Sequence, residues 1–369
     1  MLQKGTRRLV FYVLVIVFVL LAPIILGYSF GYNFDFSQNT LQKTGGIFLK
    51  SKNQRIAIFL NGVFIKETSF FSNGALFTNL LPSTYLLRVE KEGYTPWSKT
   101  IRVDSSFVTE IRNILLISKT IQSATTTPQN NLLIADFKQK QQTAPLDLRL
   151  NKNSDLVELT GTTTRVVMSR VLAFHVDDNT VYVVTTSGFL AKLNRISKEV
   201  VTIGRPGFFL RQGTVTFSQS PHGELVILDG IGGTFVLEKD GTIQSFLGGV
   251  SQVRFDESGE KALLIKEKEI DLLWLQDSRY QPFEKKYDIE TVFESKDPIL
   301  DAEWYFADNA HFAVMTRQGI YFSEIDSRGG KNTVELFSTK VDDLITIPDT
   351  PKVMYFQKGK TFFKIPIEL

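Results

Sequence analysis

The chain has 369 residues, no cysteine, and 42 Lys and Arg against 39 Asp and Glu, a net charge of +3. This length suits two or three domains of roughly 100–200 residues each. The absence of cysteine excludes disulfides, thiolate zinc sites and cysteine nucleophiles, and it fits an exported bacterial protein. The charges are spread without a basic block, which argues against a nucleic-acid partner.

The first predicted element is a membrane-spanning helix. An unbroken apolar run covers residues 9–26, and Lys4, Arg7 and Arg8 precede it. Such a run is long enough to cross the hydrocarbon core of a bilayer. Because the basic residues lie only on the N-terminal side, the positive-inside rule keeps residues 1–8 in the cytoplasm and exports the rest. We therefore predict a transmembrane helix over residues 9–31, with the lipid bilayer as its partner, in a single-pass protein of the cytoplasmic membrane.

The end of this run allows two other interpretations. The small-x-small triplet Gly27-Tyr28-Ser29 would suit a signal-peptide cleavage site, so cleavage of the helix stays open. The same residues, with Phe30 and Gly31, match the G-x-S-x-G pattern of hydrolase nucleophiles. That motif needs a strand before it and a helix behind it, whereas here it ends a membrane helix, so we interpret it as chance.

After a linker over residues 32–44, short alternating runs predict a small antiparallel β-sandwich over residues 45–104. Strands at 55–60 and 63–67 flank Asn61-Gly62, a pair that suits a type I′ hairpin. In the last predicted strand Trp97, Ile101 and Val103 share one face. Lys99 breaks that apolar face.

This segment resembles a PEGA domain, a small β-sandwich of bacterial and archaeal surface proteins. The resemblance covers roughly residues 45–103, although the Pro-Glu-Gly-Ala sequence that names the family is absent. It implies a cell-envelope setting, an adhesive or spacer role, and no catalytic residues. A purely structural role, in which Tyr94 and Trp97 close the core, is the alternative. The resemblance rests on Gly62, Leu81-Pro82, Tyr85, Gly93-Tyr94, Trp97 and Lys99.

Residues 105–369 repeat a unit of turn and apolar strand, which predicts a β-propeller. The turns recur at intervals of 36–51 residues with a mean of 44, a spacing typical of propeller blades. We predict six blades, with seven possible because residues 146–167 are hard to apportion, and a closing strand at 111–117. A stack of β-sandwiches is the alternative fold, and no helix longer than two turns is expected after Tyr32. The marker residues are Asn130, Asp178, His222, Ser258, Asn309 and Thr350.

The sequence predicts no catalytic, cofactor-binding or metal-binding residue and no cofactor. The three histidines, His175, His222 and His311, lie far apart in sequence. The glycine-rich stretch at 230–233 opens a strand, so it predicts a hairpin turn and no phosphate loop. Two sets remain ambiguous. The acidic pairs Asp177-Asp178 and Asp342-Asp343 would suit calcium or solvated turns, and Trp274, Trp304, Tyr305 and Tyr321 would line a ligand surface or pack the blades.

Together these features predict an all-β protein with one N-terminal transmembrane helix, a small PEGA-like sandwich and a propeller. We expect a noncatalytic binding or scaffold protein of the bacterial cell envelope, whose propeller presents a face to a protein or a glycan. Two other functions stay open: a propeller-based extracytoplasmic hydrolase or lyase, and an assembly factor for surface machinery.

Overall fold

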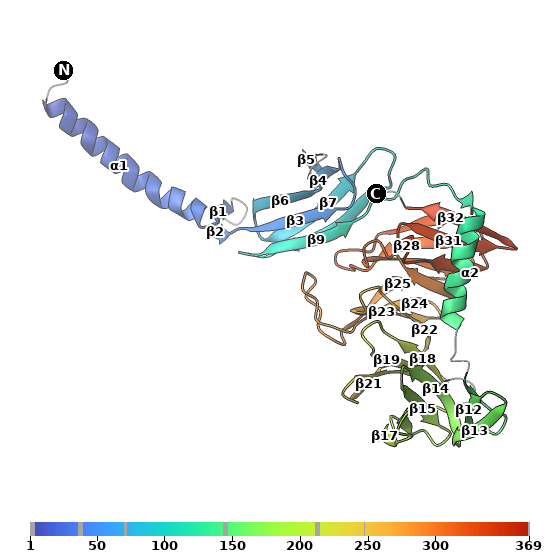
Figure 1. The fold of residues 1–369 in the computed structure, drawn as a ribbon. Helices are drawn as coiled ribbons and strands as arrows, with labels where there is room; N and C mark the ends of the chain where they lie inside the picture. The colour runs from blue at the N-terminus through green and yellow to red at the C-terminus, as the bar shows by residue number, and fades with distance from the viewer. Residues whose placement is uncertain are drawn as a thin grey trace.

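The computed structural model describes residues 4–35, 40–69, 72–142, 147–210, 215–246 and 248–367. It is built of an N-terminal helix, a two-sheet sandwich and a succession of six small sheets (Figure 1). The predicted fold class, all-β with one apolar N-terminal helix, is confirmed.

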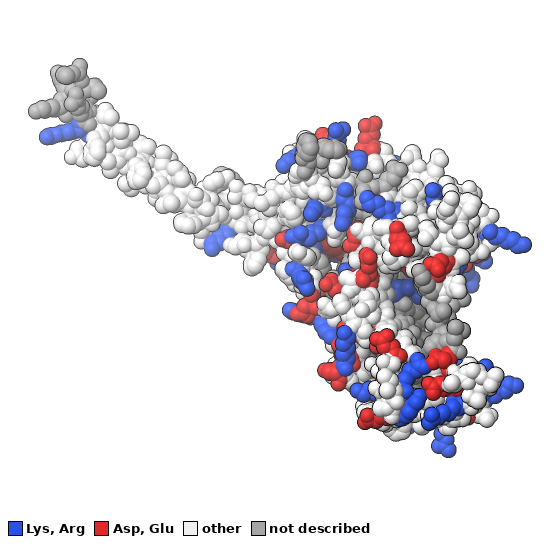
Figure 2. Space-filling view, in the orientation of Figure 1, with Lys and Arg blue, Asp and Glu red and all other residues white. Residues whose placement is uncertain are grey.

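Helix α1 (Lys4–Ser29) projects away from the rest of the molecule (Figure 1). Its segment Arg8–Ser29 is long and apolar enough to cross a membrane, with a mean hydropathy of 3.2 and no part buried. Figure 2 shows most of the helix without charged side chains and blue only at its N-terminal end, whereas charges of both signs are interspersed over the body. Such exposed apolar surface is unfavourable in water.

The helix is joined to the sandwich by hydrogen-bonded structure. The predicted linker forms the hairpin of β1 (Tyr32–Asp35) and β2 (Thr40–Lys43). The backbone N–H of Thr44 donates to Gly31 O at 2.7 Å, and its hydroxyl donates to the same oxygen at 2.9 Å. The helix end is thereby held close to the first strand of the sandwich.

The sandwich packs a three-stranded sheet, β6-β3-β9, against a four-stranded sheet, β5-β4-β7-β8. Alternating side chains of both sheets fill one core, as the periodicity of two in the sequence predicts. The strands are β3 (Gly45–Ser51), β4 (Ala57–Leu60), β5 (Val63–Glu67), β6 (Gly74–Leu80), β7 (Ser83–Glu90), β8 (Trp97–Val103) and β9 (Val108–Ile114).

The prediction of a propeller strand at 111–117 is wrong. β9 belongs to the sandwich, where it runs parallel to β3, so the sandwich continues past the predicted boundary at residue 104. The apolar run serves two cores: Ile114 and Leu116 point into the sandwich, and Leu115 and Ile117 into the neighbouring blades. A run buried on both sides has no solvent face, and periodicity alone therefore cannot assign it to one domain.

Six antiparallel sheets follow, which we call blades 1 to 6. Blade 1 has three strands and the others four; each blade packs its apolar face on the next. The strands are, in blade 1, β11 (Leu148–Leu150), β12 (Leu156–Thr160) and β13 (Thr163–Met168); in blade 2, β14 (Val171–Asp177), β15 (Thr180–Thr185), β16 (Leu190–Asn194) and β17 (Val200–Gly204); in blade 3, β18 (Thr216–Gln219), β19 (Leu225–Leu228), β20 (Thr234–Leu237) and β21 (Ile243–Phe246); in blade 4, β22 (Val250–Phe255), β23 (Lys261–Lys266), β24 (Glu269–Trp274) and β25 (Ile289–Glu294); in blade 5, β26 (Ile299–Trp304), β27 (His311–Thr316), β28 (Ile320–Glu324) and β29 (Thr333–Phe337); and in blade 6, β30 (Asp343–Thr346), β31 (Val353–Lys358), β32 (Thr361–Pro366) and β10 (Ala124–Thr125).

The last blade is completed by a strand from the start of the propeller, as predicted, but that strand is β10, which pairs with β32. From β10 the chain returns to blade 1 through helix α2 (Pro128–Gln142), which runs along the side of the blades (Figure 1). Ile134 of α2 packs on Ile345 and Tyr355 of blade 6.

The expectation of no long helix after Tyr32 is therefore wrong, and the Asn130 marker falls on α2. The true first blade lies in the stretch that was hard to apportion. A helix-start signal was present: Thr127 caps the backbone N–H of Asn130 at 3.4 Å, and Pro128 occupies the first helical position, where it needs no hydrogen-bond donor.

The first strands of blades 4, 5 and 6 share a buried polar network. Arg254 of β22 donates to Glu303 Oε1 at 3.0 Å and to Asp301 Oδ1 at 3.1 Å, so one guanidinium serves two carboxylates of β26. Thr346 of β30 adds a hydroxyl to Glu303 at 3.4 Å. Burial raises the pKa of Glu303 to about 7, although Arg254 opposes this shift.

This network predicts a pH-dependent stability. The pKa of Glu303 is higher in the folded chain than in the unfolded chain. Its stabilising contribution to the free energy of unfolding is therefore fully present below about pH 4.5 and is lost as the pH rises through about 7. We expect the free energy of unfolding of the wild type to fall over this range relative to that of Glu303→Gln, measured by urea titration. The exposed Glu335→Gln should keep the wild-type profile; parallel curves for wild type and Glu303→Gln would contradict the prediction.

Candidate functional site

The sandwich is locked onto blade 5 by the turn that follows β28. The backbone N–H of Thr100 in β8 donates to Gly329 O at 2.9 Å. Asn332 accepts from Ser98 N and donates to Ser98 O, both at 3.2 Å. The turn therefore adds to the outer edge of the sandwich sheet as a short extra strand would.

Lys99, the charge that breaks the apolar face of β8, lies at the centre of this contact. Its side chain has no exposed surface, and its ammonium pairs with Glu324 at 3.0 Å and Asp326 at 3.5 Å. Trp97 Nε1–H donates to the other oxygen of Glu324 at 3.0 Å. Lys99 thus joins two domains. In the sequence this role is visible only as a charged residue on the apolar face of a strand.

A second contact covers β9, the edge strand of the other sandwich sheet. Gln281, from the loop between β24 and β25, donates to Val108 O at 2.9 Å and accepts from Glu110 N at 3.0 Å. Arg328 donates to Glu110 O at 2.9 Å. The two contacts hold the sandwich against blades 4 and 5 from both of its sheets.

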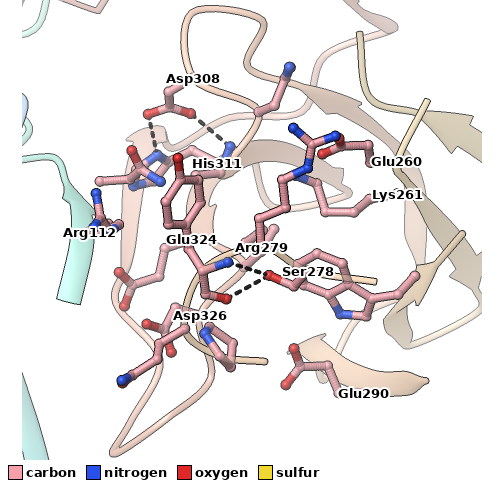
Figure 3. A pocket seen from close by; sticks show the side chains of 18 residues that line it. Arg112, Glu260, Lys261, Ser278, Arg279, Glu290, Asp308, His311, Glu324 and Asp326 are labelled. Carbon is pink, nitrogen blue, oxygen red and sulfur yellow. Dashed lines mark hydrogen bonds and ion pairs between the residues drawn. The ribbon is translucent and has the colours of Figure 1, made fainter. Parts of the chain in front are cut away.

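A pocket of about 290 Å³ lies between these two contacts (Figure 3). Blade 4 supplies Glu260 and Lys261 before and at the start of β23, Trp274 at the end of β24, the loop 278–282 and Glu290 of β25. Blade 5 supplies the turn 308–311 and the residues after β28, and β9 of the sandwich closes the space. The pocket is therefore lined mainly by blades 4 and 5, and Arg112 and Asn113 of the sandwich complete its wall.

Most charges around the pocket are already paired. Lys99 and Arg328 neutralise Asp326, and Lys99 also neutralises Glu324. Lys261 pairs with Asp256 at 3.2 Å, and Arg112 pairs with Glu110 at 2.8 Å. Asp308 accepts from His311 Nδ1 at 2.8 Å; burial alone would raise the pKa of Asp308, but His311 holds it below its usual range.

Several polar groups of the residues that line the pocket lack a partner among the described residues. Trp274 is 7% exposed, yet its indole N–H has no hydrogen-bond acceptor among the described residues, and Asn309 Oδ1 likewise lacks a donor. Arg279 and Glu260 form no ion pair within that part of the chain, and Figure 3 shows both at the pocket. An unpaired buried donor costs about 1–3 kcal/mol, so a bound oxygen at Trp274 would relieve a real penalty.

Glu290 is a pocket carboxylate whose pKa is raised. It accepts one hydrogen bond, from Ser327 Oγ at 2.5 Å. Burial raises the pKa of Glu290; the hydrogen bond from Ser327 opposes the shift, and the nearby Asp326 adds to it. A carboxyl with a raised pKa keeps its proton to a higher pH than usual, and in the protonated form it both donates and accepts hydrogen bonds.

The aromatic residues singled out from the sequence divide between packing and the pocket. Trp304 and Tyr305 are each 1% exposed, and Trp304 Nε1–H donates to Arg254 O at 2.8 Å. Tyr321 packs on Phe293 with ring centroids 6.4 Å apart. These three residues are part of the blade core, whereas Trp274 also reaches the pocket.

The other sequence candidates are not brought together. His175 of blade 2 bonds Gln219 of blade 3, His222 lies in the turn of blade 3, and only His311 of the three lines the pocket. Gly27 to Ser29 end α1, so the G-x-S-x-G match has no nucleophile turn. Asp343 pairs with Lys138 of α2, Asp342 accepts from Gly359 N at 2.6 Å, and no group of three or more potential metal ligands occurs in the described residues.

Sequence reasoning missed Glu260, Arg279, Tyr280 and Glu290 as a group. One signal pointed to them: the longest interval between turn markers, 51 residues from Ser258 to Asn309, contains the loop that carries Arg279 and Tyr280. A blade loop longer than its equivalents is a common place for binding residues.

Comparison with known proteins finds distant similarity to solved structures and no family. No family model matches the sequence, and no curated protein matches it. YCF48 from Cyanidioschyzon merolae is similar over 77% of this chain and 91% of its own, with 10% identity and a TM-score of 0.37. The β-propeller domain of Cps50 (Swd1) from Myceliophteria thermophila is similar over 58% of this chain and 76% of its own, with 11% identity and a TM-score of 0.34. The class of this protein, a propeller with a docked sandwich and an apolar N-terminal helix, rests on its own strand topology.

Proposed function

We propose that this protein is a membrane-anchored, extracytoplasmic binding protein of the bacterial cell envelope, and that the pocket between sandwich and blades takes a neutral, hydroxyl-rich ligand of the sugar class. The observation that carries the proposal is the preformed pocket that leaves the indole N–H of Trp274 without an acceptor. The basic residues at the N-terminal end of α1 and the resemblance of residues 45–103 to a PEGA domain support the envelope setting and the outward orientation.

The size and the charge state of the pocket favour this ligand class. At about 290 Å³ the pocket lies at the lower end of the range of about 300–1,000 Å³ for small-molecule sites, which suits a small sugar or the end of a chain. Because most pocket charges are paired within the protein, an ionic ligand would meet few free counter-charges.

The free groups match the hydroxyls of a sugar. A hydroxyl accepts from Trp274 Nε1–H or Arg279 and donates to Glu260, Glu290 or Asn309 Oδ1. Tyr280 is 58% exposed and lines the same pocket; the Arg112 guanidinium lies over one face of its ring, 4.5 Å from the centroid, and we expect the other face to pack on the C–H groups of a sugar.

Ligand titration of the full chain in detergent tests the proposal. We expect N-acetylglucosamine or its short oligomers to bind saturably in calorimetry, and Glu290→Gln and Trp274→Phe each to weaken binding by about tenfold or more, since a good buried hydrogen bond is worth about 1.5 kcal/mol. The matched control is Glu294→Gln, on the same strand but with a 71% exposed side chain. Absence of saturable binding, or equal affinities for Glu290→Gln and Glu294→Gln, would contradict the proposal.

An enzyme is the second candidate, favoured by one observation. A buried carboxyl with a raised pKa, as in Glu290, is the group that a hydrolase uses as a general acid. We propose a noncatalytic role and expect the oligomers to be recovered intact after incubation with the protein. Cleavage that depends on Glu290 would assign the pocket to a hydrolase instead.

The orientation has a separate test. We expect a reporter enzyme that is active only outside the cytoplasm to be active when fused after residue 367. We also expect the protein to stay with membranes in high salt and to leave them in detergent. Activity of a cytoplasmic reporter at the same point would reverse the proposed topology.

A further inference from the structure

Three exposed apolar side chains lie at the end of the sandwich that faces α1. Phe30, just after the helix, is 74% exposed, Leu41 of β2 is 63% exposed, and Phe107 in the loop before β9 is 69% exposed. They come from three separate segments of the chain. An isolated exposed apolar side chain needs no explanation, but a group of them beside a membrane helix does.

Hydrogen bonds fix the Phe107 loop next to the helix end. Ser106 N donates to Thr44 O at 2.9 Å, and Thr44 N donates to Gly31 O at 2.7 Å. Two hydrogen bonds therefore connect the residue before Phe107 to the end of α1. Phe107 O accepts from Gly46 N at 2.9 Å. The loop is therefore part of the same rigid joint as the membrane helix.

The loop 104–107 also packs closely against Gly45 at the start of β3. A Cβ on Gly45 would lie 2.3 Å from Asp104 O and 2.8 Å from Phe107 O, so only glycine at this position lets the loop approach β3. The nearest charges are paired with each other, since Arg102 bonds Asp104 at 3.0 Å. The end of the loop thus presents an aromatic ring on a rigid support.

We propose that the loop 104–107 rests in the headgroup layer of the outer leaflet and places Phe107 at the edge of the hydrocarbon. This inference rests on the proposed membrane anchoring by α1. The occupant is lipid because α1 brings the bilayer surface to this end of the sandwich, and burial of a phenylalanine there removes apolar surface from water. With two contacts, the helix and the loop, the membrane would set the tilt of the body as well as its attachment.

The absence of cysteine makes a direct test available. Single cysteines introduced as Phe30→Cys, Phe107→Cys and Phe283→Cys are labelled with a nitroxide in phosphatidylcholine vesicles, and collision rates with oxygen and with a water-soluble nickel complex are compared. Phe283 is a matched control, because it is 67% exposed on the loop that leads to β25. We expect the labels at 30 and 107 to favour oxygen and the label at 283 to favour nickel.

The outcomes separate this inference from the proposed function. A lipid signal at position 30 with a water signal at 107, matching that at 283, would overturn the loop contact and leave the anchor intact. Water signals at both 30 and 107 would overturn the anchor itself. Circular dichroism of each variant checks that the fold is kept.

Discussion

Replacing Lys99 by methionine is expected to destabilise the junction between sandwich and blades by about 3–5 kcal/mol, the cost of breaking a buried ion pair from one side. Methionine keeps the length of the side chain but leaves Glu324 and Asp326 buried without their shared cation. Urea unfolding should show an earlier transition of the sandwich, and hydrogen exchange should rise in β8 and in the turn that holds Gly329.

Arg102→Met is the matched control for Lys99→Met. Arg102 lies on the same strand and also forms an ion pair, with Asp104 at 3.0 Å, but its side chain is 81% exposed. Exposed pairs contribute about 0–1 kcal/mol, so little change is expected. Adding Glu324→Gln to Lys99→Met should recover part of the loss. Equal effects of Lys99→Met and Arg102→Met would show that the buried pair does not hold the domains together.

Gly329→Ala is expected to undock the sandwich. The φ of Gly329 is +65°, and a Cβ there would lie 1.9 Å from Thr100 O. Because the obstacle is backbone, no side chain can move aside, and the hydrogen bond from Thr100 N to Gly329 O has to break. We expect faster proteolysis between the domains and, since Arg112 and Asn113 of the sandwich line the pocket, weaker sugar binding.

Gly359→Ala separates undocking from simple backbone strain. Gly359 has a φ of +62°, almost the same as Gly329, but a Cβ there would meet nothing within 4 Å. The substitution should cost only about 1–2 kcal/mol for the left-handed conformation, with the proteolysis pattern unchanged. If Gly329→Ala and Gly359→Ala give the same proteolysis pattern and the same loss of stability, the close contact with Thr100 does not hold the domains together.

These two predictions bear on function because the junction shapes the pocket. Arg112 and Asn113 come from the sandwich, whereas Trp274 and Glu290 come from blade 4. A rigid junction lets the walls keep their spacing without ligand, which lowers the entropy cost of binding. The same junction would transmit an orientation set at the membrane to the blades.

Much of the fold could be predicted from the sequence because its signals are local. The apolar run of α1 needs no partner to be recognised, and alternation placed Trp97, Ile101 and Val103 on one buried face of β8. The mean repeat of 44 residues predicted six blades, and six sheets are present in the described residues. The error at Asn130 was also local, since the capping pair Thr127-Pro128 was interpreted as a turn.

The apolar helix, the alternating strands and the repeated blade can be recognised from the amino-acid sequence, because each depends on residues close together in the chain. The folded chain was needed to show that Lys99 is a buried cation between two domains, that residues 111–117 fill two cores, and that Trp274, Asn309 and Glu290 line one pocket. The physical reason is separation along the chain: Lys99 and Asp326 are 227 residues apart, and no local periodicity records which distant charge compensates a buried one.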